Sequence, residues 1–154
     1  MHKNEHKITH GETGTPTYET WKGMMKRCYN ENHIAFRHYG GRGIKVCEKW
    51  HKYINFKNDM GTKPDNLSID RIDNDGNYTP DNCRWATMKE QSYNRRNNKR
   101  LTYKGMTKTL YQWAESVDMD PHTFTNRIRN GWSIEKALFH PVGPCHNPNG
   151  NNGR

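Results

Sequence analysis

A single stretch, residues 67–98, carries most of the side chains of this chain that could act on an anionic substrate. Six of its side chains form a candidate set of one carboxylate, one guanidinium, one phenol and three amides. The set consists of Asp70, Arg71, Tyr78, Asn82, Gln91 and Asn94. Carboxylate and amide oxygens are the hard ligands that Mg²⁺ prefers. A guanidinium neutralises phosphate oxygens, and a phenol can serve as a base or a nucleophile.

Short elements must bring these side chains together. Apolar residues alternate in 67–72, which predicts a strand, and a polar loop of Asp, Asn and Gly follows. A second strand is expected over 83–86. Thr87 and Glu90 have capping-box spacing, so a helix is expected from Met88 to about Asn97. The stretch therefore predicts a strand, a loop, a strand and a helix, with the polar residues where they meet.

These residues resemble the HNH endonucleases, whose active site is a ββα unit that holds one divalent metal. Asp70-Arg71 stands in the place of the family's Asp-His, and 82–85 (Asn-Cys-Arg-Trp) matches its Asn-Leu-Arg-Trp segment. Gln91 falls where the family has a metal ligand on the helix, and Asn94 follows one turn later. The resemblance implies phosphodiester hydrolysis with Mg²⁺ or Mn²⁺ bound by Asp70, Gln91 and Asn94. Asn82 belongs to the motif, and we expect it to tie the loop between the strands.

The chain departs from the family where the histidine base is expected. Arg71 remains protonated at physiological pH, so it can stabilise a phosphate but cannot activate water. Tyr78 in the loop is the candidate base or nucleophile, and some HNH restriction enzymes are similar in having Asp-Arg and a loop tyrosine. A nearby guanidinium and a metal would favour its phenolate. The rival bases are His33, His38 and His51.

The cysteines leave open whether the protein has a second metal site. Cys28, Cys47 and Cys83 could meet around a structural Zn²⁺ with a histidine, although no C-x-x-C pair is present. The alternative is reduced, partly buried thiols, and a fourth cysteine, Cys145, lies near the C-terminus.

Charge points to a polyanion as partner. The chain has a net charge of +9 and a pI of about 9.5, and residues 84–108 hold eight Lys or Arg against one acid. Such a run favours contact with phosphates over a merely solvated face. The basic residues predicted to bind DNA in the first part of the chain and in this run are Arg42, Arg84, Arg95, Arg96, Lys99 and Arg100.

Four segments are expected along the chain: a poorly ordered 1–14, a nuclease domain over 15–98, a module over 99–142 and a flexible tail over 143–154. In the second, a helix from Thr17, a glycine turn at 40–43, a strand at 44–46 and a short helix over 50–56 precede the motif. In the third, a hairpin over 101–109 precedes helices that begin near Leu110, Pro121 and Ser133. The first two of these helices read as a helix-turn-helix. The side chains of the second that are expected to contact DNA are His122, Thr123, Asn126, Arg127 and Arg129.

The sequence thus predicts an α+β fold and a metal-dependent endonuclease, phage-encoded or of the homing type. Double-stranded DNA is the expected partner, with the protein as a monomer or homodimer in the cytoplasm of a bacterial host. No apolar stretch is long enough to span a membrane. Two alternatives stay open: a catalytically silent DNA-binding protein on the same scaffold, and a nuclease selective for DNA structure.

Overall fold

The computed structural model describes residues 11–141 of the 154-residue chain. Of the ends predicted to be flexible, residues 1–10 of the segment 1–14 and all of 143–154 lie outside the described part, as does Cys145. The fold is α+β, and the chain divides into two compact units after Arg96. Within the described range, no helix has the length and apolarity that a membrane crossing requires.

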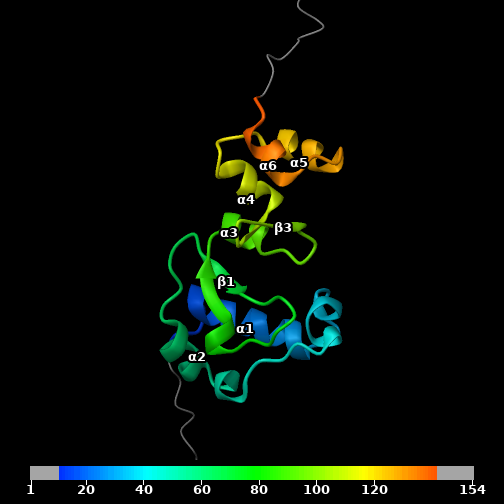
Figure 1. Ribbon diagram of the computed structural model, residues 1–154. Coiled ribbons are helices and arrows are strands. Elements are labelled where there is room, and N and C mark those ends of the chain that lie inside the picture. The colour runs from blue at the N-terminus through cyan, green and yellow to red at the C-terminus, as the bar shows by residue number, and fades with distance from the viewer. Residues whose placement is uncertain (1–10, 142–154) are drawn as a thin grey trace, which may run out of the picture. The chain divides into compact units, whose positions relative to one another are not determined.

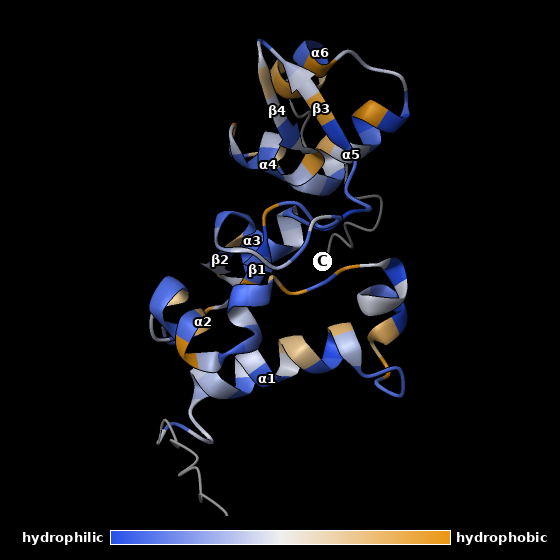
Figure 2. Cartoon of the chain, turned by 90° about the horizontal axis from the view of Figure 1, so that it is seen from below, coloured by the Kyte–Doolittle hydropathy of each residue, from blue (hydrophilic) through white to orange (hydrophobic). Residues whose placement is uncertain are grey.

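The first unit begins with its longest helix, α1 (Pro16–Tyr29). Thr15 caps it by accepting a hydrogen bond from the Tyr18 amide, and Pro16 occupies the first turn, where its missing N–H costs nothing. Figure 2 shows polar and apolar residues interspersed along α1. Met24 and Cys28 of this helix are buried. The predicted helix is confirmed.

Short helical turns connect α1 to α2 (Tyr53–Met60). They are η1 (Phe36–His38), η2 (Gly40–Arg42) and η3 (Glu48–His51). Gly40 is essential to this path, because a Cβ there would overlap the Cys28 carbonyl and the Phe36 ring. The strand predicted over 44–46 is wrong: the segment makes only one isolated parallel bridge, Val46 with Tyr78.

The strands β1 (Ser68–Arg71) and β2 (Cys83–Ala86) pair antiparallel, with Asp70 opposite Arg84. A turn, η4 (Pro80–Asn82), leads into β2, and α3 (Met88–Tyr93) follows it (Figure 1). Thr87 and Glu90 form the predicted capping box. The expected extension of this helix to Asn97 is wrong, because Asn94 already ends it as the C-cap.

The core of the first unit lies between α1, α2, β2 and the connecting loops. Its largest fully buried side chains are Trp50, Phe56, Met24 and Ile44. The Trp85 indole packs on this core and donates to the Met60 carbonyl at 2.6 Å. The core thereby fixes β2 and, through strand pairing, Asp70 on β1.

The second unit contains the predicted hairpin and three helices. The hairpin is β3 (Arg100–Tyr103) and β4 (Met106–Thr109), and the helices are α4 (Leu110–Glu115), α5 (Pro121–Arg129) and α6 (Ile134–Phe139). Asp120 and Ser133 cap α5 and α6 as predicted, and Gly131, at φ 82°, follows the end of α5. Trp113, Phe124 and Leu138 form its core.

Candidate functional site

The β1–β2–α3 region borders a cavity of about 270 Å³. Its walls come from β1, from the loop after it, from α3 and from Tyr39. The lining residues are Tyr39, Ile69, Asp70, Arg71, Asn74, Tyr78, Met88, Gln91, Ser92 and Arg95. Four of the six residues predicted to form the site, Asp70, Arg71, Tyr78 and Gln91, therefore meet at one cavity.

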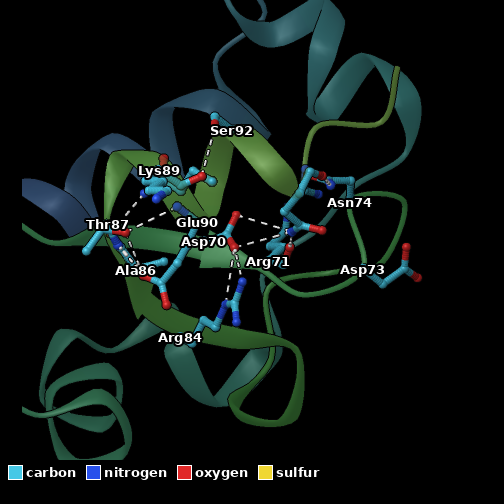
Figure 3. A network of polar contacts seen from close by, with 12 residues as sticks. Asp70, Arg71, Asp73, Asn74, Arg84, Ala86, Thr87, Lys89, Glu90 and Ser92 are labelled. Carbon is cyan, nitrogen blue, oxygen red and sulfur yellow. Dashed lines mark hydrogen bonds and ion pairs between the residues drawn. The ribbon is translucent and has the colours of Figure 1, made fainter. Parts of the chain in front are cut away.

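Asp70 is held at the cavity wall by two neighbours. It is 9% exposed, and its Oδ2 accepts hydrogen bonds from Nε and Nη2 of Arg84 at 3.3 and 3.2 Å. Asn94 Nδ2 lies 3.4 and 3.3 Å from Oδ1 and Oδ2. Figure 3 shows Arg84 reaching the Asp70 carboxylate from the neighbouring strand. These contacts are long for charge-assisted hydrogen bonds, which are usually about 2.7–2.9 Å. The carboxylate is oriented by them but not enclosed.

Two amides of the α3 region complete the oxygen set. Gln91 Nε2 donates to the Ser68 Oγ at 2.5 Å and to the Ala86 carbonyl at 3.2 Å, which fastens α3 to both strands. Asn94 Nδ2 also donates to the Arg71 carbonyl at 2.6 Å. Asn94 thus presents its amide nitrogen to the Asp70 carboxylate, whereas Gln91 is held by Ser68 and Ala86.

These residues fit a divalent cation of the hard kind. One carboxylate and two amides offer only oxygens to a metal, and Mg²⁺ is bound by one or two carboxylates while it keeps several waters. Among residues 11–141, no three side chains of the His, Cys, Asp and Glu types form a metal-binding group. In the structure the amide nitrogens of Gln91 and Asn94 make the contacts with Ser68 and Asp70, so binding of a cation by the two amide oxygens would require both amides to turn.

Arg71 is a buried cation, with 6% exposure. Its Nη1 donates to the Gly76 carbonyl at 2.9 Å. Its guanidinium carbon lies 5.1 Å from the ring centroid of Tyr39 and 4.9 Å from that of Tyr78. No carboxylate pairs with Arg71 in the described part of the chain. A buried charge without a counter-ion is costly, so this guanidinium is poised to accept an anion.

Tyr78 is more buried than expected of a reactive phenol. It is 3% exposed, its amide and carbonyl bond the segment around Val46, and its hydroxyl lies 3.4 Å from Arg27 Nη2. Burial raises the pKa of Tyr78, and this effect outweighs the lowering by Arg27 and Arg71. Arg71 lowers the pKa of Tyr78, as expected, but desolvation raises this pKa by more, so the phenolate is disfavoured.

Asn82 ties the loop between the strands. Its Oδ1 accepts from the Asp73 amide at 2.8 Å, and its Nδ2 donates to the Asp73 and Asn77 carbonyls at 3.1 and 2.8 Å. Gly76 packs closely against it, because a Cβ on Gly76 would be 2.8 Å from Asn82 Nδ2. Since Gly76 is also the carbonyl partner of Arg71, Asn82 supports Arg71 from outside the cavity.

The alternative bases and the zinc ligands have other neighbours. None of the three histidines lines the Asp70 cavity. His33 Nδ1 accepts from the Ala35 amide, His38 Nε2 from Arg37, and His51 Nε2 contacts the Tyr29 hydroxyl. The described cysteines (Cys28, Cys47 and Cys83) are free thiols, and burial raises the pKa of Cys28 and, to about 12, that of Cys83.

The predicted DNA-contacting residues of the first unit divide by their partners. Arg95 is exposed and lines the cavity. Arg84 pairs with Asp70, whereas Arg42 and Arg96 both pair with Asp75. The surface pairs are weak, so these guanidiniums can exchange Asp75 for a phosphate at little cost.

In the second unit, the loop before β3, α4 and α5 enclose a cavity of about 330 Å³. Lys99, His122 and Arg129 line it, and Asn126 is exposed on α5. Arg100 is exposed on β3. The Thr123 amide and hydroxyl are bound to Asp120.

Arg127 is placed differently from the expected DNA contact. Its Nη1 donates to the carbonyls of Ala137 and His140 at 2.9 and 2.8 Å, and its Nη2 donates to the carbonyl of Pro141 at 3.1 Å. Its guanidinium also lies over the Trp132 ring. It fastens α5 to the end of α6, so its charge is used inside the unit.

Two residues at the site escaped sequence reasoning, Tyr39 and Arg27. Tyr39 lines the Asp70 cavity and also a neighbouring cavity of about 310 Å³, which Arg27 borders. The glycine turn after Tyr39 signalled a close backbone approach, but nothing in the spacing connected it with the motif. Arg27 lies on α1, for which no functional residue was predicted.

Comparison with known proteins returns no match: no family model, curated protein or solved structure is similar to the chain at a significant level. The case for a function therefore rests on the residues and their geometry.

Proposed function

We propose that this protein is a metal-dependent endonuclease that hydrolyses phosphodiester bonds in double-stranded DNA. The observation that carries the proposal is the convergence on one cavity of the Asp70 carboxylate and the unpaired Arg71 guanidinium, with Gln91 also lining that cavity. The order of β1, β2 and α3 agrees with a ββα-metal unit of the HNH type.

The residues divide the work of hydrolysis. Asp70, Gln91 and Asn94 would hold Mg²⁺ or Mn²⁺, which supplies positive charge to the phosphate and the leaving oxygen. Arg71 binds a nonbridging phosphate oxygen and stabilises the charge that grows in the transition state. Arg95 and the basic residues that follow it attract the DNA backbone. Tyr78 remains the candidate for the nucleophile or base, after a rearrangement that exposes its hydroxyl.

A second candidate is a DNA-binding protein without catalysis. The burial of Tyr78 and the raised pKa of its phenol favour it, as does the absence of a histidine from the described cavity. This protein would bind DNA through the same basic residues and would not cleave it.

Plasmid cleavage with Mg²⁺, with Mn²⁺ and with EDTA separates the two candidates. Wild type is compared with Asp70→Ala, and Asp81→Ala on the exposed turn before β2 is the matched control. We expect metal-dependent cleavage that Asp70→Ala abolishes and Asp81→Ala retains. DNA affinity in EDTA should remain nearly unchanged in both variants and fall steeply as salt increases. Salt-sensitive binding with no cleavage by wild type would establish the binding protein.

A further inference from the structure

Two arginines and two tyrosines contact one another beside the Asp70 cavity: Arg27, Tyr39, Arg71 and Tyr78. Tyr39, Arg71 and Tyr78 line that cavity, whereas Arg27 lines the neighbouring one. The Tyr39 and Tyr78 rings are stacked, with centroids 6.3 Å apart and an interplanar angle of 17°. Each arginine approaches the Tyr39 ring, Arg27 at 5.2 Å and Arg71 at 5.1 Å. One tyrosine therefore contacts both guanidiniums.

The cluster carries two positive charges that no carboxylate neutralises. Neither Arg27 nor Arg71 forms an ion pair with any residue in the described range. Arg27 also has a buried Nε that lacks a hydrogen-bond partner. A buried donor without a partner is destabilising, and two neighbouring guanidiniums repel each other. An arrangement of this kind favours an anion.

Arg71 has few constraints other than the rings. A single hydrogen bond to Gly76 would leave its guanidinium able to rotate, whereas the faces of two tyrosines restrict where it lies. Backbone hydrogen bonds fix the main chain of Tyr78 and of Tyr39, and in this arrangement both rings lie against the Arg71 guanidinium. Through the two rings, the backbone around residues 39–43 helps to determine where the Arg71 guanidinium lies at the cavity.

We propose that Tyr39 is a positioning residue, which acts with Tyr78 to hold the Arg71 guanidinium where it binds a phosphate of the substrate. The inference rests on the proposed nuclease function and adds to it a residue outside the ββα motif. The part of Tyr39 that acts is its ring, because its hydroxyl makes no contact with Arg71 in the structure.

The test compares Tyr39→Leu and Tyr39→Phe, alone and with Arg71→Met. Loss of the ring should lower kcat/KM about tenfold, whereas Tyr39→Phe should retain most of the activity. In the Arg71→Met background, Tyr39→Leu should have no further effect, because it acts through Arg71. Tyr29→Leu is the control for stability alone: its hydroxyl bonds the Val46 backbone, and it lines none of the cavities described above. It should lower the melting temperature and leave kcat unchanged below it.

A further tenfold loss on adding Tyr39→Leu to Arg71→Met would overturn the proposal, as would a Tyr39→Phe variant as impaired as Tyr39→Leu. Wild type, Tyr39→Leu, Arg71→Met and the double variant are also assayed for binding to a DNA duplex in EDTA. If wild type never cleaves, the nuclease proposal fails, and the binding cycle decides the role of Tyr39. If Tyr39→Leu weakens DNA binding in the wild-type background but not in the Arg71→Met background, Tyr39 positions Arg71. If it weakens DNA binding equally in both backgrounds, the proposal is refuted.

Discussion

Asn82 offers the sharpest test of how the loop between β1 and β2 supports the site. Replacement of Asn82 by Ala removes three hydrogen bonds to the loop backbone, at 2.8, 3.1 and 2.8 Å. Because the side chain is only half-buried, each bond contributes at the lower end of the usual range, about 0.5 kcal/mol. The sum is about 1.5 kcal/mol, or roughly 6–12 °C in the melting temperature of a unit of this size.

Activity should fall in the same variant below its melting temperature. The Asn82 bonds hold the segment that contains Gly76, whose carbonyl binds Arg71. Asn82→Asp keeps the acceptor and loses both donors, so it should fall between Asn82→Ala and wild type. Asp81→Ala on the same turn is the control and should match wild type.

Calorimetric melting and the initial rate of plasmid cleavage at 20 °C measure the two effects separately. The reasoning is refuted if Asn82→Ala melts within about 2 °C of wild type, since the three bonds would then contribute almost nothing. A large drop in melting temperature with an unchanged cleavage rate would show that the loop stabilises the unit without positioning Arg71.

Four further predictions follow from individual side chains. Arg71→Met should raise the melting temperature, because it removes a buried charge without a counter-ion, while it lowers the cleavage rate strongly but leaves it measurable. Tyr78→Phe should lower the cleavage rate about a hundredfold or more with DNA affinity retained, and a fully active variant would exclude the phenol from catalysis. Arg127→Met should lower stability to urea by about 1–3 kcal/mol through loss of its carbonyl contacts, whereas Arg129→Met should weaken DNA binding at unchanged stability. Hydrogen bonds from Lys49 and Trp50 lower the pKa of Asp59, so its contribution is present above the unfolded carboxyl pKa of about 4 and is lost as the pH falls through the folded value. Urea titrations between pH 3 and 6 should show that loss in wild type and not in Asp59→Asn.

Most elements were predictable because their signals are local. The capping box of Thr87 and Glu90, the cap at Asp120 and the end at Gly131 each depend on groups within a few residues of one another. The alternation of apolar residues over 67–72 likewise predicts a strand, and β1 forms by pairing with β2. Such short-range rules predicted the hairpin of the motif and the helices of the second unit. They overestimated the length of α3, where the Asn94 cap ends a helix that the composition allowed to continue.

The sequence alone determined the local elements and the presence of a carboxylate, a guanidinium and amides in one short stretch. Only the tertiary structure decided what surrounds them. Tyr39 contacts Arg71 from a turn distant in sequence, and Tyr78 is buried against α1. Arg127 donates its hydrogen bonds to carbonyls at the end of α6. The physical reason is that desolvation and ring contacts depend on atoms brought from far along the chain. A spacing rule identifies the reactive group, but its neighbours set its charge, its pKa and its freedom to act.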